Sequence, residues 1–465
     1  MRAILKLQMD EDKRVELGQT PIRTIAMRYF WPALIGTMAN TLYNIVDRIF
    51  IGRVVGPEAL GGLTAVFPVM TVMTAFGMLI GLGSGVQLSI ALGKGNQRLA
   101  KMVLGNAVVM VTLISAAIML IGFALKNPML ELFGASSITM GYASDYLDII
   151  LWGVVFHEYG FSINALIRSE GNARAAMLSM LISAGVNIAL DALFIVGFGW
   201  GVKGAAWATI ISMLVLCIWV LAHFRSKRCV VRLEGRYIKI WWAVLKPVLA
   251  VGISPFLQQA AHSVVQALFN YNLIRHGGDL AVTAMGIINS VIVVAITFII
   301  SLNMALQPII GFNLGAGNYM RVKSSLKFGI VISTVICVVM WAAVQLFPAA
   351  TVRVFNADTP ELVEIGVRGL RLMTLMFPVV GFQIIAGNYF QSVNKAQMAI
   401  FLSMLRQVIM LIPILLILPR FWGVDGVWYS MPIADSISAC VTAYFLTREW
   451  HYLRGYESGI VQVKK

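Results

Sequence analysis

Four polar residues share one face of an otherwise apolar stretch near the N-terminus. Asn40, Tyr43, Asn44 and Asp47 are spaced by three and four residues, which matches the period of an α-helix. An aspartate inside a bilayer costs about 2.5 to 3.5 kcal/mol on insertion scales, so an intramembrane carboxylate indicates a function or a partner. We interpret Asp47 as a cation- or proton-binding residue and the other three as candidates to line a substrate cleft.

A second apolar stretch repeats this pattern with Ser179, Ser183, Asn187 and Asp191, spaced by four residues. If both stretches cross the membrane outward, Asp47 and Asp191 lie at similar depths and can face one cavity. Two neighbouring carboxylates in a site of low dielectric constant favour sharing a proton, or binding a cation with help from amide and hydroxyl oxygens. The alternative is that each Asp only bonds nearby amides and hydroxyls and holds helices together.

The second half of the chain carries a comparable face without charge. Gln258, His262, Gln266 and Asn270 fall on one side of a predicted helix, and Asn270 aligns with Asp47 in the internal repeat described below. Because this face has no carboxylate, cation coupling is predicted in the first half. The neutral amides are predicted to line the path or to bind substrate.

Two further pairs of ionisable residues lie within apolar segments. Arg406 and Asp435 are near the middles of adjacent predicted helices, which favours a structural ion pair. His157 and Glu158 are neighbours in sequence, so on a helix their side chains are expected to point in different directions. Neither member of the second pair is assigned a role.

No motif indicates catalysis or a resident cofactor. The sequence has no phosphate-binding loop, no zinc signature and no nucleophile with its base, and its four cysteines lie far apart. An enzyme and an ATP-driven pump are therefore excluded by the pattern. An ion gradient remains as the energy source, with H⁺ or Na⁺ as the coupling ion.

Membrane-spanning helices must position these residues. Hydrophobic residues make up 59% of the 465 positions and charged residues only 12%, whereas a soluble domain is about one quarter charged. Apolar stretches of about 20 residues, long enough to cross a bilayer, recur along the chain. We predict twelve spans, at residues 24–50, 62–91, 102–125, 139–167, 173–196, 204–223, 245–274, 282–312, 324–347, 362–389, 396–418 and 424–446.

The distribution of positive charge predicts the orientation. Most of the 36 Lys and Arg residues fall in segments that are cytoplasmic if both termini are cytoplasmic, as the positive-inside rule requires. The net charge of +15 is thus explained by topology, and no nucleic acid partner is predicted. The predicted parts are a cytoplasmic N-terminal segment (1–23), an N-lobe (24–223), a basic cytoplasmic linker (224–244), a C-lobe (245–446) and a cytoplasmic tail (447–465).

The linker mixes basic residues with aromatic ones, including Tyr237, Trp241 and Trp242. This composition is typical of an interfacial helix on anionic lipid. A loop that merely tethers the two lobes is the alternative.

The two halves are repeats of one another. A shift of about 222 positions aligns the segments 199–204 and 421–426, and also the segments 92–96 and 314–318. Because six spans separate equivalent helices, both copies cross the membrane in the same direction, which predicts parallel repeats about an axis along the membrane normal. The expected fold is therefore all-α, with two pseudo-symmetric six-helix lobes and a central cleft.

Several motifs make the chain resemble the MATE family of multidrug and toxic compound extrusion antiporters, and its MepA-like bacterial branch in particular. They are Tyr-Asn-Ile-Val-Asp at 43–47, Asn-Ile-Ala-Leu-Asp-Ala-Leu-Phe-Ile at 187–195, Gly-Trp-Gly-Val-Lys-Gly-Ala-Ala-Trp-Ala-Thr at 199–209, Arg-Gln-Val-Ile-Met-Leu-Ile-Pro at 406–413 and Pro-Ile-Ala-Asp at 432–435. The resemblance implies an N-lobe cation site at Asp47, Asn187, Asp191 and Thr209. Thr209 enters only through the resemblance, which also admits Na⁺ at these four residues.

The resemblance implies a multidrug antiporter that exports small organic cations in exchange for H⁺ or Na⁺ by alternating access. Its expected location is the bacterial cytoplasmic membrane, with both termini inside, no obligatory protein partner and the lipid bilayer as its surroundings. A flippase for lipid-linked oligosaccharides is the alternative, since such proteins share the two-lobe architecture but usually have more cationic central cavities. A channel or scaffold ranks last because the loops are short.

Overall fold

The computed structural model describes residues 15–226, 229–355 and 359–457, and these residues form helices and connecting loops without β-strands. The first lobe contains α2 (Ile22–Phe50), α3 (Pro57–Gly93), α4 (Gln97–Leu132), α5 (Met140–Ser169), α6 (Ala173–Asp191) and α7 (Gly201–Arg225). Short π-helical turns extend α2 over Ile51–Val55 and α6 over Ala192–Gly197.

The second lobe begins with α8 (Trp242–Gly315), followed by α9 (Tyr319–Leu346), α10 (Pro348–Arg353), α11 (Pro360–Met373), α12 (Phe377–Ser392), α13 (Ala396–Met404), α14 (Ile412–Ile417) and α15 (Pro419–Glu457). A π-helical segment, η4 (Leu405–Leu411), joins α13 to α14. α8 contains two predicted spans, because Gly278 breaks it with a φ of 65°.

Within the described residues, eight helices are long and apolar enough to cross a membrane, and α11 and α12 qualify together as one span bent by 50°. Division of α8 at Gly278 adds one crossing. α2 and α15 are not among the helices that pass this test of apolar composition, and both contain polar and charged residues, such as Asp47 in α2 and Asp435 in α15. With these two helices the number of crossings equals the predicted twelve. The predicted spans agree with these helices apart from shifted ends and the bend between α11 and α12.

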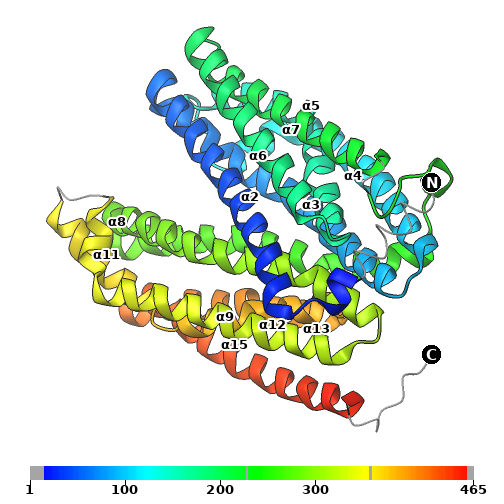
Figure 1. Ribbon diagram of the computed structural model, residues 1–465. Coiled ribbons are helices and arrows are strands. Elements are labelled where there is room, and N and C mark those ends of the chain that lie inside the picture. The colour runs from blue at the N-terminus through cyan, green and yellow to red at the C-terminus, as the bar shows by residue number, and fades with distance from the viewer. Residues whose placement is uncertain (1–14, 227–228, 356–358, 458–465) are drawn as a thin grey trace.

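The two lobes meet at one end of the molecule and diverge at the other (Figure 1). The hydrophobic cores explain this shape. One buried cluster lies within the first lobe and includes Leu151, and another lies within the second lobe and includes Trp428. A third cluster combines residues of both lobes, such as Leu92 and Phe312, at the end where the lobes meet.

Glycines bring α3 and α8 into backbone contact at this meeting end. A Cβ atom on Gly93 would lie 2.0 Å from the backbone oxygen of Phe312, and one on Gly315 would lie 2.2 Å from that of Ile90. Gly93 and Gly315 are 222 positions apart, as are Ile90 and Phe312. The two contacts are therefore equivalent under the internal repeat, and the pseudo-two-fold axis passes between these helices.

The segment that precedes the first lobe is bound by the second. Arg321 donates from Nη2 to the backbone oxygens of Leu17, at 3.1 Å, and of Thr20, at 2.7 Å. Asn313 donates from Nδ2 to the same oxygen of Leu17 at 3.0 Å. Residues 15–20 thus cross the seam between the lobes.

The segment that precedes the second lobe is bound by the first. Asn106 on α4 accepts from the backbone N–H of Trp241 at 2.9 Å and donates to its backbone oxygen at 3.3 Å. Lys101 donates to Glu234 at 2.5 Å, and this hydrogen bond, together with Arg236, lowers the pKa of Glu234. Both lobes are therefore held by segments that cross to the other lobe.

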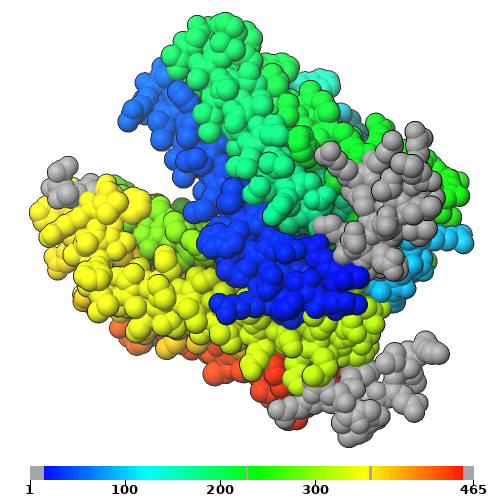
Figure 2. Space-filling view, in the orientation of Figure 1, coloured from blue at the N-terminus to red at the C-terminus, as the bar shows by residue number. Residues whose placement is uncertain are grey.

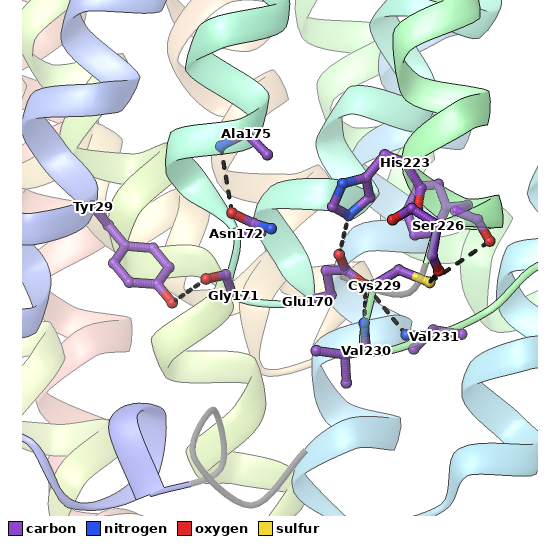
Figure 3. Close-up of polar contacts among 11 residues, drawn as sticks. Tyr29, Glu170, Gly171, Asn172, Ala175, His223, Ser226, Cys229, Val230 and Val231 are labelled. Carbon is purple, nitrogen blue, oxygen red and sulfur yellow. Dashed lines mark hydrogen bonds and ion pairs between the residues drawn. The ribbon is translucent and has the colours of Figure 1, made fainter. Parts of the chain in front are cut away.

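The linker is not an interfacial helix. Between α7, which ends at Arg225, and α8, which begins at Trp242, the described residues contain a single 3₁₀ turn at Gly235–Tyr237 and are otherwise non-helical; we call residues 229–241 the strap. Its first residues are fixed instead by Glu170, whose Oε2 accepts from the backbone N–H groups of Val230 and Val231 at 3.1 and 3.2 Å (Figure 3). Backbone groups spent on such bonds are not available for a helix, so the tethering alternative describes this segment.

Glu170 also bonds the His223 side chain at the end of α7 (Figure 3). Nearby, the Tyr29 hydroxyl of α2 donates to the backbone oxygen of Gly171 at 2.9 Å. The loop between α5 and α6 therefore ties together α2, α7 and the strap at the meeting end.

Candidate functional site

A cavity of about 540 Å³ opens among the helices of the first lobe. It is lined from α2, α3, α5, α6 and α7, and three residues of α8, Gln259, Val293 and Met304, close it from the second lobe. The molecular surface is hollowed between the two lobes (Figure 2). The site is therefore shared between a pocket inside one lobe and the cleft between both.

The predicted carboxylates come together at this cavity. Asp47 lines it, and Asp191 lies close enough to interact with Asp47 electrostatically. Asp47 is 7% exposed, and Asp191 and Asn187 are fully buried. In the described part of the chain, both oxygens of Asp191, both side-chain polar atoms of Asn187 and Oδ1 of Asp47 have no hydrogen-bond partner.

Such unsatisfied atoms carry a high cost, because a buried polar atom without a partner loses about 1 to 3 kcal/mol, and charged groups lose more. Two carboxylates and one amide supply hard oxygen ligands, which suit a proton, Na⁺ or water bridging between them. Thr209, which the resemblance added, also lines the cavity and is 7% exposed. Asp47 and Thr209 thus line the cavity, whereas Asn187 and Asp191 are buried in α6, and the binding of a cation by all four stays a prediction.

The remaining residues of the α2 stripe also reach this cavity. Asn40, Tyr43 and Asn44 line it, although Asn44 spends its Nδ2 donor on the backbone oxygen of Asn40 at 2.8 Å. Tyr146 of α5 lines it too and is buried. Sequence reasoning missed Tyr146, because one tyrosine in an apolar helix gives no pattern that separates it from packing.

Two arginines line the same cavity. The guanidinium carbon of Arg48 lies 5.2 Å from the centroid of the Phe67 ring, and Arg168 donates a hydrogen bond to the Asn164 side chain. The lining therefore contains positive as well as negative groups, which the sequence stripes did not indicate.

None of the four residues of the uncharged face of the second lobe lines the cavity, although a neighbouring glutamine does. Gln259 lines it, whereas Gln258 lies in a separate small pocket with Gln383 and Arg406. His262, Gln266 and Asn270 are not among the residues that line either pocket. Their place on a substrate path stays a prediction.

The predicted ion pair in the second lobe is present. Arg406 Nε donates to Asp435 Oδ1 at 2.7 Å, and their side chains are 16% and 4% exposed. Gln383 donates to the backbone oxygen of Asp435 at 2.5 Å. The pair connects η4 to α15 within the lobe.

The expectation that His157 and Glu158 diverge is wrong. His157 Nδ1 lies 3.3 Å from Glu158 Oε1, and His157 lines the cavity while Glu158 is buried behind it. Helix geometry separates neighbouring Cβ atoms, but two long side chains can curve around the helix and meet.

A membrane protein built from two repeated helical lobes, with unpaired carboxylates in a cavity beside the inter-lobe cleft, has the architecture of a secondary transporter. The MatE family model matches residues 32–193 and 256–416, one match in each lobe. Because these matches cover more than half of the chain, the protein belongs to the MATE family. Members of this family are transporters and not enzymes.

Individual relatives agree with this assignment. Multidrug export protein MepA from Staphylococcus haemolyticus is 24% identical over 456 residues, which are 98% of this chain and 100% of MepA. MepA from Staphylococcus aureus is 26% identical over 431 residues, which are 93% of this chain and 95% of MepA.

Solved structures extend the likeness to the whole fold. The MATE multidrug transporter DinF-BH superposes with a TM-score of 0.87 at 37% identity, covering 92% of this chain and 96% of that one. An outward-facing multidrug resistance MATE transporter of the MOP superfamily has a TM-score of 0.89 at 24% identity, covering 94% and 98%. At that identity the second likeness shows the fold alone.

Proposed function

We propose that this protein is a multidrug efflux antiporter, which exports small organic cations from the bacterial cytoplasm in exchange for H⁺ or Na⁺. The observation that carries the proposal is the cluster of buried, unpartnered polar atoms on Asp47, Asn187 and Asp191 beside the cavity. The relatives that cover almost the whole chain are multidrug export proteins, which supports the same function.

Transport follows from competition for the carboxylates. A cationic substrate in the cavity is attracted to Asp47 and Asp191, and a coupling ion that binds between them removes that attraction. Because a ligand shifts a conformational equilibrium only when it binds the two states unequally, the two ligands must favour different states of the lobes. Competition for the same charges supplies this difference.

The orientation and location belong to the same proposal. We place both termini in the cytoplasm, which the distribution of Lys and Arg supports, and the protein in the cytoplasmic membrane, which its bacterial relatives support. The end where the lobes meet is then cytoplasmic, and the structure is open toward the outside.

The test is efflux of ethidium from proteoliposomes under an imposed pH gradient or an imposed Na⁺ gradient. Asp47→Asn and Asp191→Asn should each abolish gradient-driven efflux while the protein stays folded. Asp148→Asn is the matched control, because this carboxylate lies on α5 of the same lobe but pairs with Lys126 outside the cavity lining. Equal efflux by wild type and both cavity variants would contradict the proposed site.

Arg48 and Arg168 support a second candidate function. Positive groups in the cavity suit an anionic head group, so a flippase for lipid-linked oligosaccharides remains the alternative. A wild-type protein that moves no organic cation under either gradient, but moves a lipid-linked pyrophosphate substrate, would establish this alternative.

A further inference from the structure

Glu158 is a buried carboxylate that the proposed site does not use. It is 1% exposed, and its side chain has one described hydrogen-bond partner, His157 Nδ1 at 3.3 Å. A carboxylate at membrane depth requires a counter-charge or a proton. Arg406 gives Asp435 a permanent counter-charge, whereas the imidazole beside Glu158 can gain and lose its charge.

The surroundings of Glu158 close it on the side of α3. A Cβ on Gly77 would lie 3.1 Å from Glu158 Oε2 and 2.9 Å from the ring of Phe161. The backbone of α3 therefore packs directly against the carboxyl group, which only a glycine allows. Protons can then reach Glu158 from the cavity through His157.

His157 stands between Glu158 and the cavity. Its ring lines the cavity and stacks on that of Phe161, with centroids 6.3 Å apart and planes inclined by 10°. The contact of Nδ1 with the carboxylate fixes the orientation of the imidazole. Nε2 is then the nitrogen that can accept a proton from the cavity.

Other ionisable groups of the cavity lie elsewhere. From α2 these are Tyr43, Asp47 and Arg48, and from α5 they are Tyr146 and, at the far end of the helix, Arg168, which bonds Asn164. The elements that pack around His157 and Glu158 contribute uncharged lining residues, namely Met73 and Thr74 from α3, Met213 and Leu216 from α7, and Gln259 from α8. The charge at this place is thus set mainly by the two residues themselves.

We propose that His157 and Glu158 form a second proton-binding site of the cavity, separate from Asp47 and Asp191, whose proton competes with a cationic substrate. Without the proton on Nε2 the pair carries one negative charge and attracts a cation. With the proton on Nε2, the imidazolium and the carboxylate together carry no net charge. The competition, though not the proton site itself, rests on the proposed function.

The first measurement needs no substrate. Proton uptake by the purified full-length protein in detergent is titrated between pH 8.5 and pH 5.5 for wild type, Glu158→Gln, His157→Gln and the control Glu131→Gln, an exposed carboxylate at the end of α4. Wild type and control should take up about one more proton per molecule than His157→Gln, and in Glu158→Gln the same proton should be taken up at lower pH, because the imidazolium has lost its counter-charge. Superimposable curves for wild type and Glu158→Gln would overturn the proposal.

The second measurement uses ethidium, whose positive charge does not depend on pH. Each proton displaced on binding changes the Kd by about tenfold per pH unit. The dependence in His157→Gln should be shallower than in wild type by about one proton, with the part due to Asp47 and Asp191 retained, and in Glu158→Gln the step due to this proton should move to lower pH. An unchanged slope in both variants would contradict the competition.

The two measurements separate the two failures. If wild type binds no ethidium but its extra proton uptake is lost in His157→Gln and moved to lower pH in Glu158→Gln, the proton site is supported and the proposed substrate class is wrong. If Glu158→Gln does not fold, as judged by gel filtration, His157→Gln alone decides the outcome, because it keeps a hydrogen-bonding side chain beside Glu158.

Discussion

The glycine contacts between α3 and α8 predict how the lobes can be forced apart. A Cβ at Gly93 would lie 2.0 Å from the backbone oxygen of Phe312, whereas such contacts need about 3 Å or more. The helices in Gly93→Ala must therefore separate by about 1 Å at the end where the lobes meet. Overpacking of this kind costs about 1 to 3 kcal/mol in the closed arrangement.

A cost of that size changes the ratio of the two conformations by about 5- to 150-fold. Because the clash exists only while this end is closed, Gly93→Ala should shift the protein toward the state that opens there. The repeat predicts the same effect for Gly315→Ala, whose Cβ would lie 2.2 Å from the backbone oxygen of Ile90.

The assay is a distance measurement between spin labels on cysteines introduced at Arg98 and Lys327, which are exposed near the starts of α4 and α9. The four native cysteines are replaced first. Gly286→Ala on α8 is the matched control, because no atom lies within 4 Å of the added Cβ. Gly93→Ala and Gly315→Ala should show longer label distances; distributions identical to the control would refute the reasoning.

Three further outcomes follow from charged contacts. Arg321→Lys keeps the charge but loses the guanidinium fork, so the same label distances should lengthen, though less than with a glycine variant, and unchanged distances would show that residues 15–20 do not hold the seam. The hydrogen bond from Lys101 lowers the pKa of Glu234 in the folded state. The contact therefore stabilises the linker fully at pH values above the unfolded-state pKa of Glu234, and this stabilisation is lost as the pH falls through the folded-state pKa. Hydrogen exchange of the linker, corrected for its intrinsic pH dependence, should accelerate in acid, and in Glu234→Gln already at neutral pH; equal exchange at neutral pH would contradict this. Asp435→Ala should lower the free energy of unfolding in SDS-containing micelles by about 3 to 5 kcal/mol because Arg406 stays charged, whereas Arg406→Met with Asp435→Leu should be nearly neutral, and equal losses would exclude a buried pair.

The sequence predicted the fold well because its strongest signals are local or periodic. Apolar length located the spans, and the shift of 222 positions anticipated the equivalent contacts of Gly93 and Gly315. The stripes on α2 and α6 identified Asp47, Asn187 and Asp191, because a helical period reports which side chains share a face.

What the sequence could not supply depends on contacts between distant segments. The strap around Glu170 is non-helical because backbone groups of Val230 and Val231 bond that carboxylate, and composition alone suggested a helix. The meeting of His157 and Glu158 depends on side-chain rotamers, which helix periodicity does not determine. Gln259 rather than His262 reaches the cavity, which depends on which face of α8 meets the first lobe.

The two lobes share a backbone repeat but treat their intramembrane charges in opposite ways. In the second lobe, Asp435 is paired with Arg406. The buried side-chain atoms of that lobe that have no partner in the described residues, such as Gln383 Oε1, are uncharged. In the first lobe, Asp191 has no partner at either oxygen in the described residues. A bound cation can therefore release far more free energy in the first lobe, because only there does it replace a missing counter-charge. This asymmetry in paired and unpaired charges supports the proposal that the coupling ion binds in the first lobe.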